Sequence, residues 1–212
     1  MNFITDPAEI EKRSFEIIAK KLADRDFDPD NINVIKRVIH TTADFDFADN
    51  LAFSDGAVNA AKEVLKKGAR IVTDTQMARA GINKKAAARL GCEVFCFIDS
   101  PEVIDTASAE GTTRARAAVD RARLTLENPM IFVVGNAPTA LIRIHESIES
   151  GSLSPALIVA VPVGFVNVIE SKELIMDLDV PRIVAKGRKG GSNVAAAIIN
   201  ALLYETTERD IK

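Results

Sequence analysis

The sequence contains few of the residues that build several common classes of site. Of its 212 residues none is tryptophan, one is tyrosine, two are histidine and two are cysteine. On a strand, Cys92 and Cys96 would lie about 13 Å apart, which is too far for a disulfide or a shared metal ion. We therefore expect two buried, reduced thiols, no protein-bound metal, and a core of aliphatic side chains.

A large charge of one sign and long apolar runs are also lacking. The formal net charge is −3, which argues against general nucleic-acid binding because that needs a basic surface. No run approaches the ~20 apolar residues of a membrane-spanning helix, and residues 1–11 lack the apolar core of a signal peptide. With 47% hydrophobic and 27% charged residues, the composition predicts a cytoplasmic, globular protein that forms one domain over residues 1–212.

The hydrophobic pattern divides the chain into two parts. Residues 1–68 predict three helices, and His40 lies near the end of the second. From residue 69 to 212, short apolar strands alternate with helices, which predicts a five-stranded parallel sheet in a three-layer α/β/α sandwich. The predicted strands are residues 70–73, 92–98, 130–134, 156–161 and 182–185. The predicted helices are residues 7–22, one that begins at 28–30, and residues 54–67, 76–90, 112–127, 138–150, 167–176 and 193–204.

A polar cluster lies at the end of the second predicted helix. His40 stands between Arg37 and a run of two threonines and two aspartates within residues 41–46. Histidine exchanges a proton near neutral pH, so the cluster favours proton chemistry; a surface histidine among solvated charges is an equally supported interpretation. The aspartates lack the glycine and the terminal glutamate of a calcium loop, so we interpret them as a structural turn.

Further polar and glycine-rich segments follow the predicted strands, where ligands of a parallel sheet bind. Residues 187–192 combine exposed backbone N–H groups, a helix N-terminus and two cations, which predicts an anion site. Their spacing matches neither a P-loop nor a dinucleotide-binding loop, so no motif supports a nucleotide. Arg114 and Arg116 oppose a helix dipole, which is easier to understand if one of them binds an anion. Lys172 is weaker evidence, because a helical lysine is usually solvated.

Four segments of the chain carry a resemblance to a known family. They are residues 37–44, residues 135–141, residues 163–166 together with 170–172, and residues 187–192. In this order they resemble the motif set of the precorrin-8X methylmutase family, which includes the cobalt-precorrin-8 methylmutases. The similarity extends over essentially the whole chain, and no motif of the set is missing. The form of residues 41–46 favours the cobalt-containing substrate.

The resemblance implies an isomerase that moves a methyl group from C11 to C12 of (cobalt-)precorrin-8 to give cobyrinate or hydrogenobyrinate. It also implies a flavodoxin-like sheet of strand order 2-1-3-4-5 and a homodimer with its site at the subunit interface. The family's active histidine corresponds to His40, which would act on a ring proton, and two substrate contacts correspond to Ser14 and Arg37. No cofactor is expected, and cobalt, where present, would arrive within the substrate.

The residues themselves agree with a substrate that is a large, flat, polycarboxylate tetrapyrrole, because arginine and lysine pair well with carboxylates. The expected substrate-binding residues are Ser14, Arg37, Thr41, Arg114, Arg116, Asn136, Lys172, Arg188 and Lys189. Two other functions stay open: a non-catalytic tetrapyrrole carrier, and a nucleotide-binding enzyme of flavodoxin-like build. Neither nucleic acid nor a membrane is expected as a partner.

Overall fold

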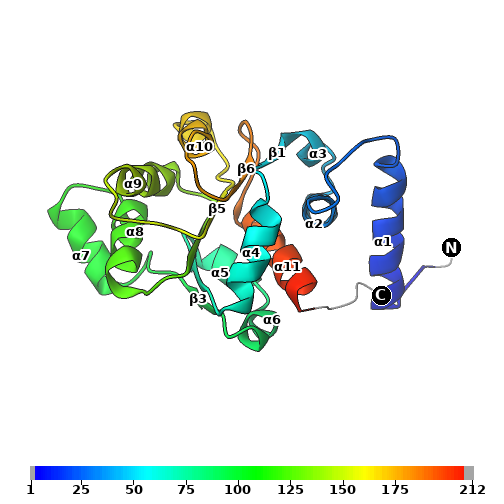
Figure 1. Ribbon diagram of the computed structural model, residues 1–212, viewed down its shortest axis with the longest axis horizontal. Helices are drawn as coiled ribbons and strands as arrows, with labels where there is room; N and C mark the ends of the chain where they lie inside the picture. The colour runs from blue at the N-terminus through cyan, green and yellow to red at the C-terminus, as the bar shows by residue number, and fades with distance from the viewer. Residues whose placement is uncertain (1–2, 208–212) are drawn as a thin grey trace.

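The computed structural model describes residues 3–207 and shows three layers, with one sheet between two sets of helices (Figure 1). Its strands are β1 (Leu51–Phe53), β2 (Arg70–Thr73), β3 (Glu93–Phe95), β4 (Met130–Val134), β5 (Leu157–Ala160) and β6 (Arg182–Ala185). The six strands lie in the order β1-β6-β5-β4-β2-β3. From β6 to β3 all neighbours pair in parallel, whereas β1 pairs antiparallel with β6 at the edge.

The predicted all-parallel sheet of five strands is wrong in one respect, because the sheet is mixed and includes β1 as a sixth strand. The three residues of β1 pair with residues 183–185 of β6. A three-residue strand is too short to show a period in the sequence, and the strand that pairs with it is the last one in the chain. The N-terminal part of the chain therefore contains a strand in addition to its predicted helices.

The helices are α1 (Pro7–Lys21), α2 (Ile32–Thr42), α3 (Phe47–Asn50), α4 (Ala57–Lys66), α5 (Gln76–Gly81), α6 (Lys84–Arg89), α7 (Pro101–Ala109), α8 (Arg114–Thr125), α9 (Pro138–Glu149), α10 (Val168–Met176) and α11 (Ser192–Thr206). One face of the sheet is covered by α4, α5, α6 and α11, and the other by α8, α9 and α10, with α7 packed on α8. Beyond the β1 edge, α2 packs on α11 and α1 packs on α2 (Figure 1). Within residues 3–207, none of these helices is long and apolar enough to cross a membrane.

The central strands are apolar on both sides because both faces of the sheet are buried. In β4, Ile131 and Val133 belong to the core on the α11 side, whereas Phe132 and Val134 belong to the core on the α8 and α9 side. None of these four side chains is more than 2% exposed. Burial of one such side chain stabilises a fold by ~1.5–3 kcal/mol, so the sheet provides a rigid edge for its loops.

Two predicted elements differ in extent from those observed. Residues 76–90 form α5 and α6 rather than one helix, because the Asn83 side chain caps α6 and its backbone N–H is bound by Asn200. Residues 101–109 form α7, a helix that was not predicted although Pro101 stands in its first turn. Both differences arise at short helices, where the apolar period is brief.

The two cysteines occupy different environments. Cys92 is buried, and its thiol donates to the backbone oxygen of Leu65 at 3.3 Å. Cys96 lies beyond the end of β3 and is partly exposed. The prediction of two buried thiols is therefore right for Cys92 and wrong for Cys96, because the predicted strand 92–98 ends at residue 95.

Candidate active site

The loops that follow the parallel strands meet at one edge of the sheet, and Asp74 connects two of them. This buried residue follows β2, and its carboxylate accepts hydrogen bonds from the backbone N–H groups of Gly135, Asn136 and Ala137 at 2.9, 2.8 and 2.7 Å. Burial raises the pKa of the Asp74 carboxyl, and the three N–H bonds oppose that shift. The carboxylate thus fills the electropositive N-terminus of α9.

This contact bears on the nucleotide hypothesis. The strand order reverses between β2 and β4, which is where doubly wound proteins bind nucleotides. Here the N–H groups suited to a phosphate bind Asp74, and a Cβ at Gly135 would lie 2.8 Å from the Cα of Ser192. The predicted site residue Asn136 is exposed, but its backbone N–H points inward to Asp74. The loop after β4 therefore packs against Asp74 and Ser192, and its backbone N–H groups are not available to a phosphate.

Hydrogen bonds from Lys172 hold the backbone of the glycine-rich loop at residues 187–192. This side chain on α10 is 1% exposed, and its ammonium donates to the backbone oxygens of Gly187 at 2.7 Å and Lys189 at 2.9 Å. Burial lowers the pKa of Lys172 to about 8. A Cβ at Gly190, where φ is 159°, would lie 2.1 Å from the oxygen of Val161. Lys172 is thus neither solvated nor open to a large ligand, and its ammonium holds the loop.

Lys189 joins this loop to the segment that follows His40. Its Nζ donates to Asp44 Oδ2 and to Asp46 Oδ2, each at 2.6 Å. These hydrogen bonds raise the pKa of Lys189 and lower that of Asp44. The two aspartates therefore form part of a turn, which confirms the prediction from the sequence, and the turn lies against a predicted substrate-binding loop. Arg188, the neighbouring predicted cation, is exposed.

His40 lies in the last turn of α2, and the packing of that helix decides where it points. Val34, Ile35, Val38 and Ile39 are at most 3% exposed and belong to the core shared with α11. Arg37 and His40 lie one turn apart outside this apolar stripe and contact α1. The helix ends where Ala43 adopts the left-handed conformation, with φ of 55°.

The imidazole of His40 is stacked on the Phe15 ring of α1. The ring centroids are 4.9 Å apart and the planes differ by 7°. Burial lowers the pKa of His40 below its ordinary value of 6.5, the positive charge of Arg37 lowers it further, and Glu11 opposes both. The imidazole is therefore mostly neutral at pH 7 and able to accept a proton.

Arg37 is held by two aromatic rings and one carboxylate. Its Nη1 lies 2.9 Å from Glu11 Oε1, and its guanidinium carbon lies 4.7 Å from the ring centroid of Phe15 and 5.3 Å from that of Tyr204 on α11. Ser14, also on α1, donates its hydroxyl to the backbone oxygen of Ile10. The structure therefore gathers Ser14, Arg37 and His40 where α1 packs on α2. The hydroxyl of Thr41 donates back to the Arg37 oxygen at 3.0 Å.

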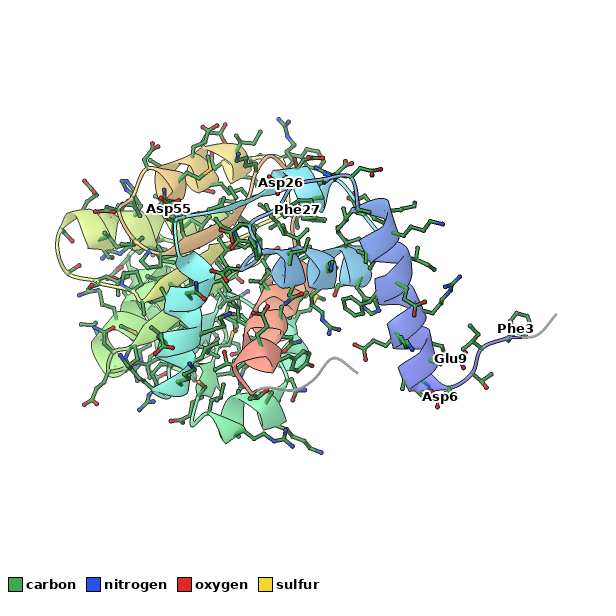
Figure 2. The ribbon with its side chains drawn as sticks, turned by 45° about the vertical axis from the view of Figure 1, so that its right-hand side comes forward. Phe3, Asp6, Glu9, Asp26, Phe27 and Asp55 are labelled. Carbon is green, nitrogen blue, oxygen red and sulfur yellow. The ribbon has the colours of Figure 1, made fainter. Side chains whose placement is uncertain are left out.

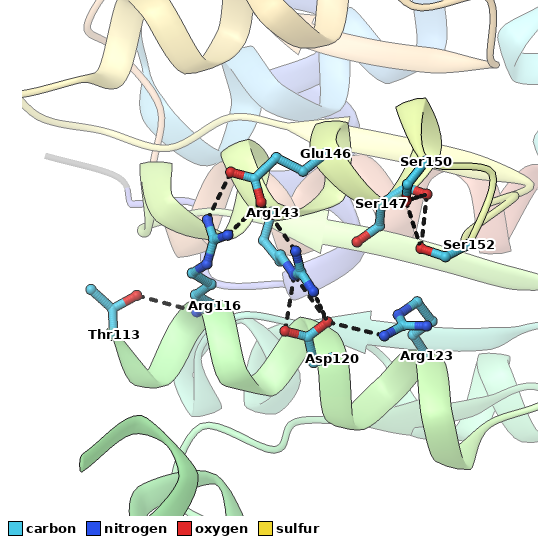
Figure 3. Close-up of polar contacts among 9 residues, drawn as sticks. All are labelled: Thr113, Arg116, Asp120, Arg123, Arg143, Glu146, Ser147, Ser150 and Ser152. Carbon is cyan, nitrogen blue, oxygen red and sulfur yellow. Dashed lines mark hydrogen bonds and ion pairs between the residues drawn. The ribbon is translucent and has the colours of Figure 1, made fainter. Parts of the chain in front are cut away.

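Arg116 belongs to an ion network between α8 and α9 (Figure 3). Both of its terminal nitrogens contact the Glu146 carboxylate, which is also bound by Arg143. Arg143 and Arg123 in turn contact Asp120. Arg116 therefore already has an anionic partner, and the hydrogen bonds of this network lower the pKa of Glu146.

The predicted cations of α8 do not lie beside His40 within one copy of the chain. Arg114 is exposed at the start of α8, and Arg116 follows it by half a turn. In Figure 1, α8 and α2 lie at different ends of the sheet, and α8 covers the face opposite α11, on which α2 packs. We expected all the predicted cations to bind one substrate. Within one copy of the chain, the fold instead separates Arg114 and Arg116 of α8 from the cations nearer His40.

Three residues of the His40 environment were not predicted. Phe15 is a partly buried residue of an amphipathic helix, and in the sequence such a residue indicates core. Glu11 and Tyr204 meet Arg37 from opposite ends of the chain, so no local spacing relates them. Tyr204 is the single tyrosine, and this is the one sequence signal that could have singled it out.

Comparison with known proteins shows the same family along almost the whole chain. The family model for precorrin-8X methylmutase matches residues 9–205. The chain belongs to the precorrin-8X methylmutase family. A curated cobalt-precorrin-8 methylmutase of Salmonella typhimurium is 46% identical over 213 residues, which cover 98% of this chain and 100% of that protein. A precorrin-8X methylmutase of Pseudomonas aeruginosa is 36% identical over 97% of this chain and 99% of its own length.

The solved structures agree with the sequence comparisons. A precorrin-8x methyl mutase from Thermus thermophilus superposes with a TM-score of 0.87 at 39% identity, over 94% of this chain and 98% of that one. Membership of the methylmutase family confirms the predicted family and the predicted class of enzyme, an isomerase of cobalamin biosynthesis. A methylmutase transfers a group within one molecule, so orientation and electrostatic stabilisation are what such a protein can supply.

Proposed function

We propose that this chain moves the methyl group from C11 to C12 of cobalt-precorrin-8, and that His40 handles the ring proton whose movement permits the shift. The observation that carries the proposal is the position of the His40 imidazole, which stacks on Phe15 where Arg37 also contacts α1. Burial and the charge of Arg37 lower the pKa of His40, which favours the neutral imidazole at pH 7. A neutral imidazole accepts a proton and then returns it as an imidazolium, which suits a tautomerisation that leaves the enzyme unchanged. No nucleophile or hydride carrier is needed for an intramolecular shift.

Arg37 and Ser14 are proposed to bind the substrate beside His40. The Arg37 guanidinium has five N–H donors, so it can hold a substrate carboxylate while one nitrogen stays on Glu11 Oε1. The Ser14 hydroxyl donates its one hydrogen to the backbone oxygen of Ile10, and its oxygen can still accept a hydrogen bond from the substrate. Thr41, Arg188 and Lys189 come from segments joined to the same turn and are proposed as further contacts.

A second copy of the chain is proposed to complete the site. The outward side of α1 exposes Ile10 and Ile17, which are 44% and 49% exposed, and α1 stands at one end of the molecule (Figure 2). A helix with apolar side chains on its free face is typical of a subunit contact. Arg114 and Arg116 lie away from His40 within one copy, so in a homodimer they are proposed to reach the partner's substrate, as is Asn136.

The cobalt-containing substrate is proposed over the metal-free one. Of the two curated relatives named above, the one that shares more residues with this chain carries the name cobalt-precorrin-8 methylmutase. We also interpret the five parallel strands as a flavodoxin-like sheet. Taken without β1, they have the order β3-β2-β4-β5-β6, which corresponds to 2-1-3-4-5 when the parallel strands are numbered alone. This interpretation places the substrate beyond the carboxyl ends of the strands.

The test compares His40→Ala with His145→Ala, the only other histidine substitution that the chain allows. His40→Ala should lower turnover of cobalt-precorrin-8 by ~10²–10⁴-fold while the protein still binds the cobalt-containing product cobyrinate and keeps its unfolding midpoint. His145→Ala should retain turnover. Undiminished turnover by His40→Ala would disprove the assigned role of His40.

The same preparation separates the two other functions. A non-catalytic carrier would release no product, so several turnovers per protein would dismiss it. A nucleotide-binding enzyme would be stabilised against heat by FMN, NAD or ATP. Because Asp74 occupies the N–H groups at the β2–β4 crevice, we expect no shift of the unfolding midpoint with any of the three.

A further inference from the structure

We infer that Phe15 is a positioning residue for the methyl shift: its ring covers one face of the His40 imidazole and fixes the plane in which that imidazole meets the substrate. The inference rests on the role proposed for His40. It assigns to α1 a part in the chemistry beyond contact with the substrate. Three observations support it, and they concern the stacking, the anchoring of the Phe15 ring, and the charges around the imidazole.

The stacking restricts an imidazole that its own helix leaves loosely held. His40 lies in the last turn of α2, three residues before the left-handed Ala43 that ends the helix, and the final turn of a helix is its least constrained part. The Phe15 ring lies nearly parallel to the imidazole, with planes 7° apart and centroids 4.9 Å apart. This is the offset stacked arrangement that aromatic pairs prefer. Rotation of the imidazole out of its plane would break the contact.

The Phe15 ring is itself anchored, which a positioning residue requires. The guanidinium of Arg37 lies over it at 4.7 Å. That guanidinium is fixed from α1 by Glu11 at 2.9 Å and from α11 by the ring of Tyr204 at 5.3 Å. The ring that supports His40 is therefore connected through Arg37 of α2 to Tyr204 of α11. Both α1 and α11 pack on α2.

The third observation concerns how the Phe15 ring affects the protonation of the His40 imidazole. The charged groups that act on the imidazole are Arg37, one turn earlier on α2, and Glu11 on α1. Burial is the largest influence on the imidazole and disfavours the imidazolium, and Phe15 supplies apolar cover on one face. An aromatic face also attracts a cation, which would favour the imidazolium. The Arg37 guanidinium already lies over the Phe15 ring, and its positive charge disfavours a second cation nearby. We therefore expect that the main effect of Phe15 is to bury the imidazole and so to lower the pKa of His40.

The first experiment needs no substrate, so it stands apart from any failure of the proposed function. The chain has only two histidines, so a proton NMR titration has two imidazoles to follow, with His145 as the internal reference. In Phe15→Ala, water reaches the imidazole, and the pKa of His40 should rise towards its ordinary value. In Phe15→Tyr it should stay as in wild type. A His40 pKa that is unchanged or lower in Phe15→Ala would overturn the inference.

The second experiment separates positioning from binding and from simple loss of stability. With cobalt-precorrin-8 as substrate, Phe15→Ala should lower kcat about tenfold or more, with KM changed less than about twofold, because misorientation of a reacting group acts on the chemical step. Phe15→Tyr should restore kcat to within about twofold. Phe97→Ala removes a matched stacked ring, at 6.0 Å from Phe95, and controls for the loss of an aromatic pair elsewhere.

The results distinguish a positioning role of Phe15 from a purely structural one. A kcat loss in Phe15→Ala that Phe97→Ala reproduces, or that Phe15→Tyr does not restore, would show a purely structural role and contradict the inference. If His40→Ala keeps full turnover while Phe15→Ala still raises the His40 pKa, the contact is confirmed and the proposed catalytic role of His40 is the part that fails.

Discussion

Replacement of Lys172 by methionine tests how a buried cation fixes the loop at residues 187–192. Within residues 3–207, Lys172 is the only buried lysine or arginine, and Asp74 is the only buried carboxylate. The Lys172 ammonium has no carboxylate partner among the ion pairs of this part of the chain, and it meets two backbone oxygens, those of Gly187 and Lys189. Methionine has a similar length and no charge, so it removes the hydrogen bonds with little change in packing.

The expected effect on stability follows from two opposing contributions. Burial lowers the pKa of Lys172 from 10.5 to about 8, and at ~1.4 kcal/mol per pH unit this corresponds to a cost of about 3 kcal/mol for burying the charged form at pH 7. Hydrogen bonds from a charged donor contribute ~1.5–3 kcal/mol each, and Lys172 makes two. Lys172→Met should therefore lower the free energy of unfolding at pH 7 by no more than about 3 kcal/mol.

The pH dependence is the sharper measurement. Between pH 8 and 10.5 the unfolded chain still holds the Lys172 proton while the folded chain has released it, so the stability of the wild type gains with rising pH. Lys172→Met lacks this gain, so the wild type should become more stable relative to the variant by up to about 3 kcal/mol across that interval. Urea unfolding of wild type, Lys172→Met and the exposed control Lys186→Met, at pH 7 to 10, measures it. A difference that stays flat with pH would refute the reasoning.

Two further substitutions probe the loops at the sheet edge. In Gly190→Ala, the new Cβ would lie 2.1 Å from the oxygen of Val161, so we expect a loss of about 3 kcal/mol or more by urea unfolding. Gly187→Ala, where φ is 71° and no atom lies within 4 Å, should cost only about 1 kcal/mol, and equal losses would contradict the steric argument. Asp74→Ala should cost about 2–4 kcal/mol, because it leaves three backbone N–H groups without their acceptor; a loss below 1 kcal/mol would show that water replaces the carboxylate.

The parallel strands could be predicted because their residues face two buried layers at once. In β4, all five side chains are buried, so the run is apolar without interruption, and strands of this kind alternate with helices along the chain. β1 could not be found in this way, since its three residues become a strand only by pairing with β6. The break between α5 and α6 likewise depends on Asn200, which binds Asn83 from a helix near the end of the chain.

For the site, the sequence indicated which residues could carry the chemistry, but not which side chains pack against them. His40 and Arg37 stood out as a proton-exchanging group beside a cation, and the resemblance to the methylmutases added Ser14. The stacking of Phe15 on His40 could not be predicted, because it depends on how α1 packs on α2. Lys172 illustrates the opposite error: a lysine on a helix suggests a solvated surface, but the packing of α10 against the loop buries it.

The cations around the site differ in how freely they can meet a substrate carboxylate. Lys172 is enclosed, and its two carbonyl contacts maintain the loop rather than a ligand. Lys189 instead pairs with Asp44 and Asp46 at the surface, where ion pairs add little stability. The Arg37 side chain is 12% exposed, and its partner Glu11 is 45% exposed. We therefore expect that a substrate carboxylate can replace the two aspartates on Lys189 at small cost, and that it can join Glu11 on the other guanidinium nitrogens of Arg37. Cations that are neutralised before binding create no strong positive field, which fits the net charge of −3. We therefore expect selection of a polycarboxylate to depend on whether its acid groups reach Arg37 and Lys189, where Glu11, Asp44 and Asp46 now lie, rather than on attraction to a positive surface.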